Sequence, residues 1–178
     1  MSAKYQSAPG SHARFALIAP WLMLMALSSS EERKPPPASF NYGELPVSGT
    51  WADARRAGFK ACIATNVDMR CRREGVSFEG RGPFSGAVDL VGGDGGGGFD
   101  HVTLWHKTDQ SALVGIVSKL RIAGWSECLT PVGNRWGGQA IYQHQGSPIF
   151  ISMDLSYWSI RRLTVYPATP ANIPRCRA

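Results

Sequence analysis

Residues 99–125, FDHVTLWHKTDQSALVGIVSKLRIAGW, predict a strand followed by a helix. Apolar and polar residues alternate over 101–106, which is the period of a strand with one buried face. Asp109 stands where a helix N-cap is favoured, and Gly124 stands where a helix ends. A helix over about 109–124 must bury its apolar stripe, and a sheet is the expected surface. The stripe consists of Leu113, Ile116, Val117 and Leu120.

Strand patterns lie on both sides of this helix, as short segments rich in β-branched and aromatic residues and bounded by glycine or proline. A shorter helix is expected from Thr50, as its N-cap, to about residue 64. This order predicts an α+β fold, with a mainly antiparallel β-sheet packed on one main helix and a short N-terminal helix. Residue identities indicate no internal repeat. The expected strands cover residues 75–79, 87–91, 101–106, 128–131, 139–144, 149–155 and 162–166.

The first 30 residues have the pattern of a secretory signal peptide. Lys4 and Arg14 accompany an uncharged apolar run over 15–27, and small residues at 26–30 suit signal-peptidase cleavage. The run is shorter than the roughly 20 residues of a spanning helix, which favours cleavage over retention as an anchor. We expect a periplasmic or secreted protein without a stable membrane span after cleavage. A proline-rich linker over 31–47 and a single domain over 48–178 are expected to follow.

The mature chain is only mildly basic. The sequence has 19 lysines and arginines, and removing Lys4 and Arg14 leaves 17 against 13 acidic residues, a net charge of +4. The arginines occur in scattered pairs, without the dense basic stripe and stacking aromatic residues of a nucleic-acid surface. Nucleic acid is therefore not an expected partner, whereas an anionic envelope surface or an acidic protein is compatible with this charge.

The four cysteines, Cys62, Cys71, Cys128 and Cys176, all lie in the mature part. An even number in an exported chain predicts two disulfides, and four cysteines allow three connectivities. We favour Cys62 with Cys71, which closes a short loop, and Cys128 with Cys176, which ties the C-terminal tail to the domain. No Cys-x-x-Cys pair occurs, so neither a zinc knuckle nor a thioredoxin-like redox pair is indicated.

A glycine-rich segment, GGDGGGG at 92–98, precedes the strand pattern at 101–106. A phosphate-binding glycine loop leads into a helix, whereas a strand follows here. Calcium-binding glycine-aspartate turns occur in tandem copies, and Asp94 and Asp100 alone supply too few ligands. We interpret the segment as the loose tip of a hairpin between 87–91 and 101–106. Alternation then places four side chains away from the core: Asp89, His101, Thr103 and Trp105.

Residues 99–125 also resemble the opening strand and helix of vicinal-oxygen-chelate (glyoxalase-like) modules, in which Asp-His-Val-Thr-Leu begins the first strand. The resemblance implies a β-α-β-β-β module, a metal ion bound by His101, and Asp154 at the place of a carboxylate ligand. His-Val-Thr-Leu at 101–104 is similar to one half of the paired His-x-Thr signature of two-histidine phosphoesterases. That resemblance implies acid–base chemistry at His101.

Tryptophans, tyrosines and arginines crowd the C-terminal two thirds of the chain. Exposed together, such residues form a surface typical of protein interfaces or a stacking platform for sugars. No Gly-x-Ser-x-Gly elbow accompanies the serines, and the carboxylates are dispersed, so catalysis is not the favoured hypothesis. The expected binding residues are Trp105, Tyr157, Trp158, Arg161 and Arg162.

The favoured hypothesis is an exported binding, accessory or inhibitor module for a protein or glycan of the cell envelope, acting without a cofactor. The alternative is a small metal-dependent enzyme of glyoxalase-like type, with His101 as a metal ligand.

Overall fold

The computed structural model describes residues 37–130, 138–155 and 160–174, and the structural statements below concern these residues. The chain divides into two compact units, Met1–Arg33 and Lys34–Ala178, and the described residues all belong to the second. The predicted signal peptide lies outside them. No helix in this described part is long and apolar enough to cross a membrane.

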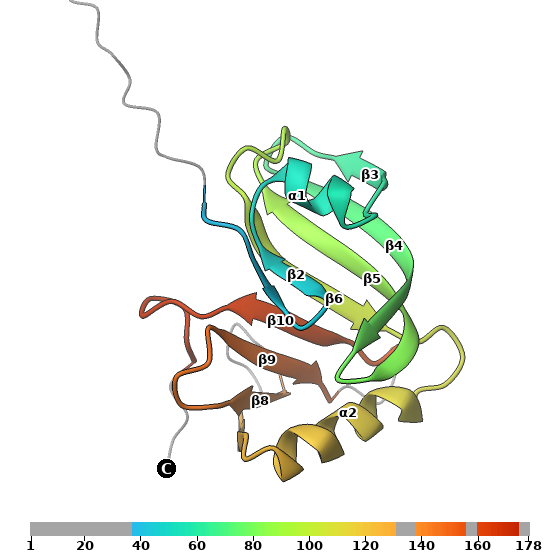
Figure 1. Ribbon diagram of the computed structural model, residues 1–178, viewed down its shortest axis with the longest axis vertical. Helices are drawn as coiled ribbons and strands as arrows, with labels where there is room; N and C mark the ends of the chain where they lie inside the picture. The colour runs from blue at the N-terminus through green and yellow to red at the C-terminus, as the bar shows by residue number, and fades with distance from the viewer. Residues whose placement is uncertain (1–36, 131–137, 156–159, 175–178) are drawn as a thin grey trace, which may run out of the picture. The chain divides into compact units, whose positions relative to one another are not determined.

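The described residues form two strands, a helix, four strands, a second helix and four further strands (Figure 1). The helices are α1 (Trp51–Arg56) and α2 (Ser111–Ile122). The strands are β1 (Phe40–Tyr42), β2 (Leu45–Ser48), β3 (Ala61–Ala64), β4 (Asp68–Phe78), β5 (Arg81–Val91), β6 (Phe99–Trp105), β7 (Ser126–Leu129), β8 (Gln139–Gln143), β9 (Ile149–Asp154) and β10 (Leu163–Pro167).

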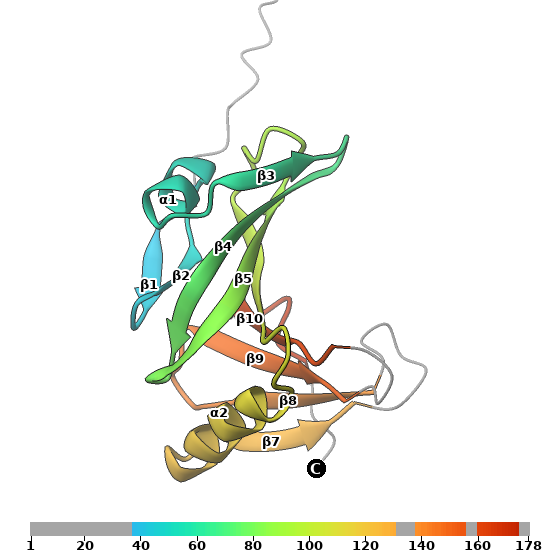
Figure 2. The same cartoon turned by 90° about the vertical axis from the view of Figure 1, so that its right-hand side faces the viewer.

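Eight of these strands form one sheet in the order β3-β4-β5-β6-β10-β9-β8-β7, and β1 and β2 form a separate hairpin. Every pairing in the large sheet is antiparallel. Both helices and the β1–β2 hairpin lie on one side of the large sheet (Figure 2). The predicted α+β architecture with a mainly antiparallel sheet is therefore confirmed, and it carries two helices.

The core lies between the sheet and these covering elements. The four apolar residues of the predicted stripe on α2 are buried. They join one cluster with Leu45 of β2, Phe59 after α1 and the inward-facing residues of the central strands. Each fully buried leucine or phenylalanine side chain stabilises the fold by roughly 2 kcal/mol. On β5 and β6 this cluster includes Val88, Leu90, Val102 and Leu104, as alternation predicts, together with Phe84 and Phe99. The intervening side chains point to the opposite side, which we call the distal face.

The two halves of the sheet repeat one structural unit. α1 is followed by β3-β4-β5-β6, α2 is followed by β7-β8-β9-β10, and the halves meet where β6 pairs with β10. Thr103 lies opposite Thr164, between the pairs Leu104–Leu163 and Val102–Val165. This register is symmetric about the threonine pair, and it aligns VTLW (102–105) with LTVY (163–166).

The ends of the two helices repeat each other as well, in ARRAGF (54–59) and LRIAGW (120–125). The amides of residues 57, 58 and 59, which follow α1, donate to the carbonyls of Asp53, Arg55 and Ala54, respectively. The amides of residues 123, 124 and 125, which follow α2, donate to the carbonyls of Lys119, Arg121 and Leu120 in the same pattern. Gly58 and Gly124 have φ of 90° and 82°, and the aromatic residue after each is buried. Residue identities gave no indication of this repeat, because the halves share hydrogen-bond geometry and few residue identities.

Two expectations for the N-terminal part of the domain are wrong. The linker predicted over 31–47 contains β1 and most of β2, because Leu45 and Val47 are buried in the core and fix the hairpin despite the prolines. The helix predicted to about residue 64 ends at Arg56, because Gly58 turns the chain into β3. β3 then pairs with β4, which begins at Asp68 rather than at residue 75.

The predicted disulfide between Cys62 and Cys71 is confirmed, and it joins directly opposed positions of β3 and β4. It is the one disulfide whose two cysteines both lie in the described part of the chain. No cysteine among the described residues has a free thiol. Cys176, the predicted partner of Cys128, lies outside those residues, so the second disulfide stays a prediction.

The glycine-rich segment connects β5 to β6, as predicted, but it packs closely against neighbouring backbone. Val91 N donates to Gly98 O at 2.9 Å, and Phe99 N donates to Gly49 O at 3.0 Å. Gly98 has φ of 81°, and a Cβ there would lie 2.2 Å from Pro37 Cγ and 2.8 Å from Gly49 O. A side chain has no room at this position, so the segment is not the loose tip expected from its composition.

Candidate binding site on the distal face

Three arginines, a tryptophan and an isoleucine surround one hollow on the distal face. The hollow has a volume of about 340 Å³, and we call it the arginine pocket; the described residues that line it are Arg70, Arg72, Trp105, Ile160 and Arg162. Two of the predicted binding residues, Trp105 and Arg162, therefore lie together. Arg70 and Arg72 were missed because β4 was predicted to begin at residue 75. Their spacing of two residues within a strand is the signal that would have revealed them.

The strand register explains why a hollow forms here. Arg72 lies opposite Ala87, Ala87 opposite Thr103, and Thr103 opposite Thr164, so a row of small side chains crosses the sheet beside Arg72. Ala87 and Thr103 are 0% and 3% exposed. Larger side chains on the neighbouring strands stand around this row. Leu104 pairs with Leu163. The next pair of positions, Trp105 and Arg162, are therefore neighbours at one end of the hollow.

The positive charge of the arginine pocket is only partly compensated. Arg70 Nη1 lies 3.3 Å from Asp89 Oδ1, whereas Arg70 Nε is buried without a hydrogen-bond partner. Arg72 and Arg162 are exposed, and within the described residues neither forms a salt bridge. A buried donor without an acceptor costs about 1–3 kcal/mol. The pocket therefore presents guanidinium donors that an incoming oxyanion can satisfy.

His101 lies on β6 beside the pocket, between two carboxylates. Its Nδ1 is 2.7 Å from Asp100 Oδ2, and its Nε2 is 3.0 Å from Asp89 Oδ2. Burial alone would lower the pKa of His101, but Asp100 and Asp89 outweigh this effect and raise the pKa to about 9. His101 is therefore an imidazolium at neutral pH, with both ring nitrogens acting as donors. Asp89 accordingly contacts two cations, His101 and Arg70.

The symmetric register relates His101 to Arg162 and Tyr166 to Trp105. A cation thus lies beside an aromatic ring twice on the distal face. At the first place, the His101 and Tyr166 rings are 5.2 Å apart between centroids, and two carboxylates enclose the imidazolium. At the second place, Arg162 and Trp105 open into the arginine pocket. The repeated fold therefore produced one closed and one open version of the same arrangement.

The described residues contain no group of three or more His, Cys, Asp or Glu side chains that could hold a metal ion. His101, the predicted metal ligand, contacts a carboxylate with each ring nitrogen. Asp154 lies on β9, two strands away from β6. Four strands follow α2, where the glyoxalase-like resemblance implies three. Within the described residues, the structure therefore does not bring Asp154 to His101 as a second metal ligand.

Among the described residues, Arg161 is the remaining predicted binding residue, and it does not line the pocket. Arg161 is half-buried, and its backbone amide donates to Gln110 Oε1 at 2.7 Å. This bond attaches the segment before β10 to the residue that precedes α2. Tyr157 and Trp158 lie outside the described residues.

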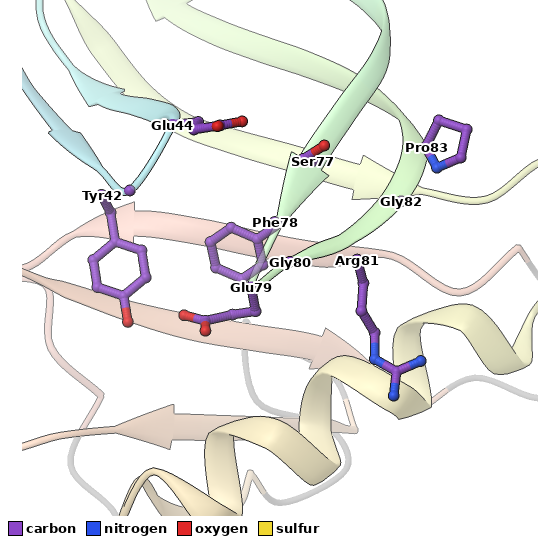
Figure 3. A pocket seen from close by; sticks show the side chains of 10 residues that line it. Tyr42, Glu44, Ser77, Phe78, Glu79, Gly80, Arg81, Gly82 and Pro83 are labelled. Carbon is purple, nitrogen blue, oxygen red and sulfur yellow. The ribbon is translucent and has the colours of Figure 1, made fainter.

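A second hollow, of about 670 Å³, lies between the β1–β2 hairpin and the β4–β5 turn (Figure 3). Its aromatic residues are engaged in packing, because Tyr42 lies 5.9 Å from Phe78 and 6.2 Å from Trp125 between ring centroids. Burial and the neighbouring Glu79 carboxylate raise the pKa of Tyr42 to about 12. Lys119 of α2 donates to the Glu79 carbonyl at 2.6 Å and so fixes the turn. This hollow is therefore better explained as the junction of hairpin, turn and helix than as a ligand site.

No protein-family model, curated protein or solved structure matches this chain. The proposals below rest on the geometry and chemistry of the distal face.

Proposed function

We propose that this protein is an exported binding module, accessory or inhibitory in role, for a protein or glycan of the cell envelope. It binds through the arginine pocket and the distal face around it. The observation that carries the proposal is the grouping of three guanidinium groups and one indole around a single hollow. Arginine and tryptophan are enriched at binding surfaces, where they supply most of the affinity.

The charge balance of the pocket supports a binding role. Arg72 and Arg162 repel each other and Arg70, and they gain no ion pair from the described part of the chain in return. A partner that brings negative charge relieves this repulsion and gains charge-assisted hydrogen bonds. Export is supported by the N-terminal sequence pattern and by the Cys62–Cys71 disulfide, because disulfides persist in oxidising compartments.

The alternative, a glyoxalase-like metal enzyme, needs a neutral imidazole with a free nitrogen at His101. The two carboxylates beside His101 favour the opposite protonation state. We therefore prefer the binding role. The metal content of the purified protein and of His101→Ala decides between them: one metal ion per chain that is lost in the variant would replace our proposal by the enzyme.

The binding role is tested by photo-crosslinking at two isoleucines. A photoreactive residue replaces Ile160, which lines the pocket and is 43% exposed, or Ile122, which lies on α2 and is 88% exposed. Each protein is irradiated in an extract of the cell envelope, and the adducts are identified by mass spectrometry. We expect a defined adduct at position 160 and none at position 122. Equal adducts at both positions, or none at either, would overturn the proposal.

A further inference from the structure

We propose that the arginine pocket binds a phosphate group carried on a sugar, and thus that the envelope partner is a phosphate-bearing glycan. This inference rests on the proposed function and names the ligand of the same site. Its basis is the combination of three guanidinium groups, from two parts of the sheet, with one indole at the end of the hollow.

The arrangement of the donors favours a tetrahedral anion. Arg70 and Arg72 are two residues apart on β4, so their Cα atoms are roughly 7 Å apart along the strand. Arg162 precedes β10, which lies three strand spacings from β4, or about 14 Å. Guanidinium groups that approach from both sides need an acceptor with oxygens in several directions. A phosphate offers three or four such oxygens in tetrahedral directions, whereas a carboxylate offers two in one plane, which a single arginine can bind in bidentate fashion.

One donor of a pocket residue has no hydrogen-bond acceptor among the described residues. Arg70 uses Nη1 for Asp89, and its buried Nε has no partner. Asp89 does not neutralise Arg70 alone, because its Oδ2 lies 3.0 Å from His101 Nε2. Asp89 is therefore shared by Arg70 and His101, while Arg72 and Arg162 form no salt bridge within the described residues and remain available to a ligand.

The size and lining of the hollow favour a sugar phosphate over phosphate alone. A volume of about 340 Å³ exceeds the share of roughly 30 Å³ that one water molecule occupies by an order of magnitude. Arg72 of β4 and Trp105 of β6 both line this space, so it extends across the intervening strand β5. The half-exposed indole offers a flat apolar surface for a sugar ring beside the bound anion.

The inference is tested by calorimetric titration of the purified protein at low salt, where charge pairing is least screened. The probes are inorganic phosphate, glucose 6-phosphate, glucose, glucuronate and a short oligoglutamate peptide. We expect both phosphate probes to bind, glucose 6-phosphate more tightly, and glucose not to bind. Arg72→Gln and Arg162→Gln should each weaken glucose 6-phosphate binding by about tenfold, since each removes a charge-assisted contact.

Two further variants control this experiment. Arg55→Gln makes the same change in net charge on the exposed surface of α1, far from the pocket lining, and should leave binding unchanged. Trp105→Leu should remove the preference for glucose 6-phosphate over inorganic phosphate while phosphate still binds. Unfolding curves of all variants establish that the fold is retained.

Three results would overturn the inference: no binding of either phosphate probe, an equal loss in Arg55→Gln, or tighter binding of glucuronate or oligoglutamate than of glucose 6-phosphate. The first two deny the phosphate site, and the third assigns the pocket to carboxylate ligands. Crosslinking at Ile160 keeps the two proposals separate. A defined adduct that persists in Arg72→Gln at full yield would retain the binding role and refute the phosphate site.

Discussion

Replacing His101 by glutamine should remove most of the pH dependence of stability between pH 6 and 9.5. The pKa of His101 is about 9 in the fold, where Asp100 and Asp89 overcome the effect of burial. In the unfolded chain it is about 6.5. A group with a raised pKa stabilises the fold fully below the unfolded value and loses this contribution as the pH rises through the folded value. The difference corresponds to about 3 kcal/mol.

We therefore expect the free energy of unfolding to fall by about 3 kcal/mol from pH 6 to pH 9.5 in the parent protein. In His101→Gln the curve should be nearly flat and should lie below the parent curve at pH 6, because Asp100 then lacks its cation and Asp89 keeps only Arg70. Urea unfolding at half-unit pH steps measures both curves. The window ends below pH 10, since tyrosines ionise there in the unfolded chain; burial raises the pKa of Tyr142 to about 12 in the fold.

His144→Gln is the matched control, because His144 is exposed. Its curve should follow that of the parent protein. An NMR titration of the His101 imidazole gives the folded pKa directly. A folded pKa near 6.5, or equal stability of His101→Gln and the parent at pH 6, would refute the assignment of His101 as a residue held charged at neutral pH by two carboxylates.

Three further predictions concern the framework that holds the distal face. Gly98→Ala should lower the free energy of unfolding, measured in urea, by at least about 2 kcal/mol more than Gly124→Ala. Both glycines have φ near 80°, but only at Gly98 would the added Cβ lie within 3 Å of proline and backbone atoms. Equal losses would show that packing at this loop is unimportant. Replacing Cys62 and Cys71 together by serine should cost about 2–3 kcal/mol, and an unchanged thermal midpoint would contradict this stabilising role. Asp53→Ala should cost about 1 kcal/mol, because its carboxylate accepts hydrogen bonds at the start of α1; a smaller loss than at an exposed carboxylate elsewhere would deny the cap.

Much of the fold around α2 was predictable because its signals are local. The four predicted stripe residues of α2 are all buried. Its ends were predicted less well: the helix covers Ser111–Ile122 rather than 109–124, and its N-cap residue is Gln110 rather than Asp109, although the Asp109 carboxylate accepts hydrogen bonds from Ser111. Alternation on β5 and β6 likewise assigned their side chains correctly to two faces. The N-terminal part was harder to predict. Four prolines and a charged run concealed β1 and β2, and arginines at alternate positions concealed the first half of β4.

The candidate site was predictable only in fragments. Trp105 and Arg162 were selected as binding residues from residue type, but nothing local connects two residues so far apart in the chain. Arg70 and Arg72 were counted among scattered, solvated arginines. They join the site because β4 begins at Asp68, before the apolar segment from which it was predicted, and so includes both arginines. In addition, β5 places a small residue, Ala87, between them and β6.

The sequence by itself determined where strands and helices lie around α2, which faces they bury, and the Cys62–Cys71 pairing, because these depend on periodicity and short spacings. Tertiary structure alone decided that β6 lies beside β10. Strand pairing over long separations depends on which whole arrangement buries the core best, and no local pattern encodes that choice. The β6–β10 pairing joins the two repeated halves of the sheet and places Trp105 beside Arg162. On the same two strands, the His101 cation is enclosed by carboxylates, whereas the Arg162 cation is open to the arginine pocket.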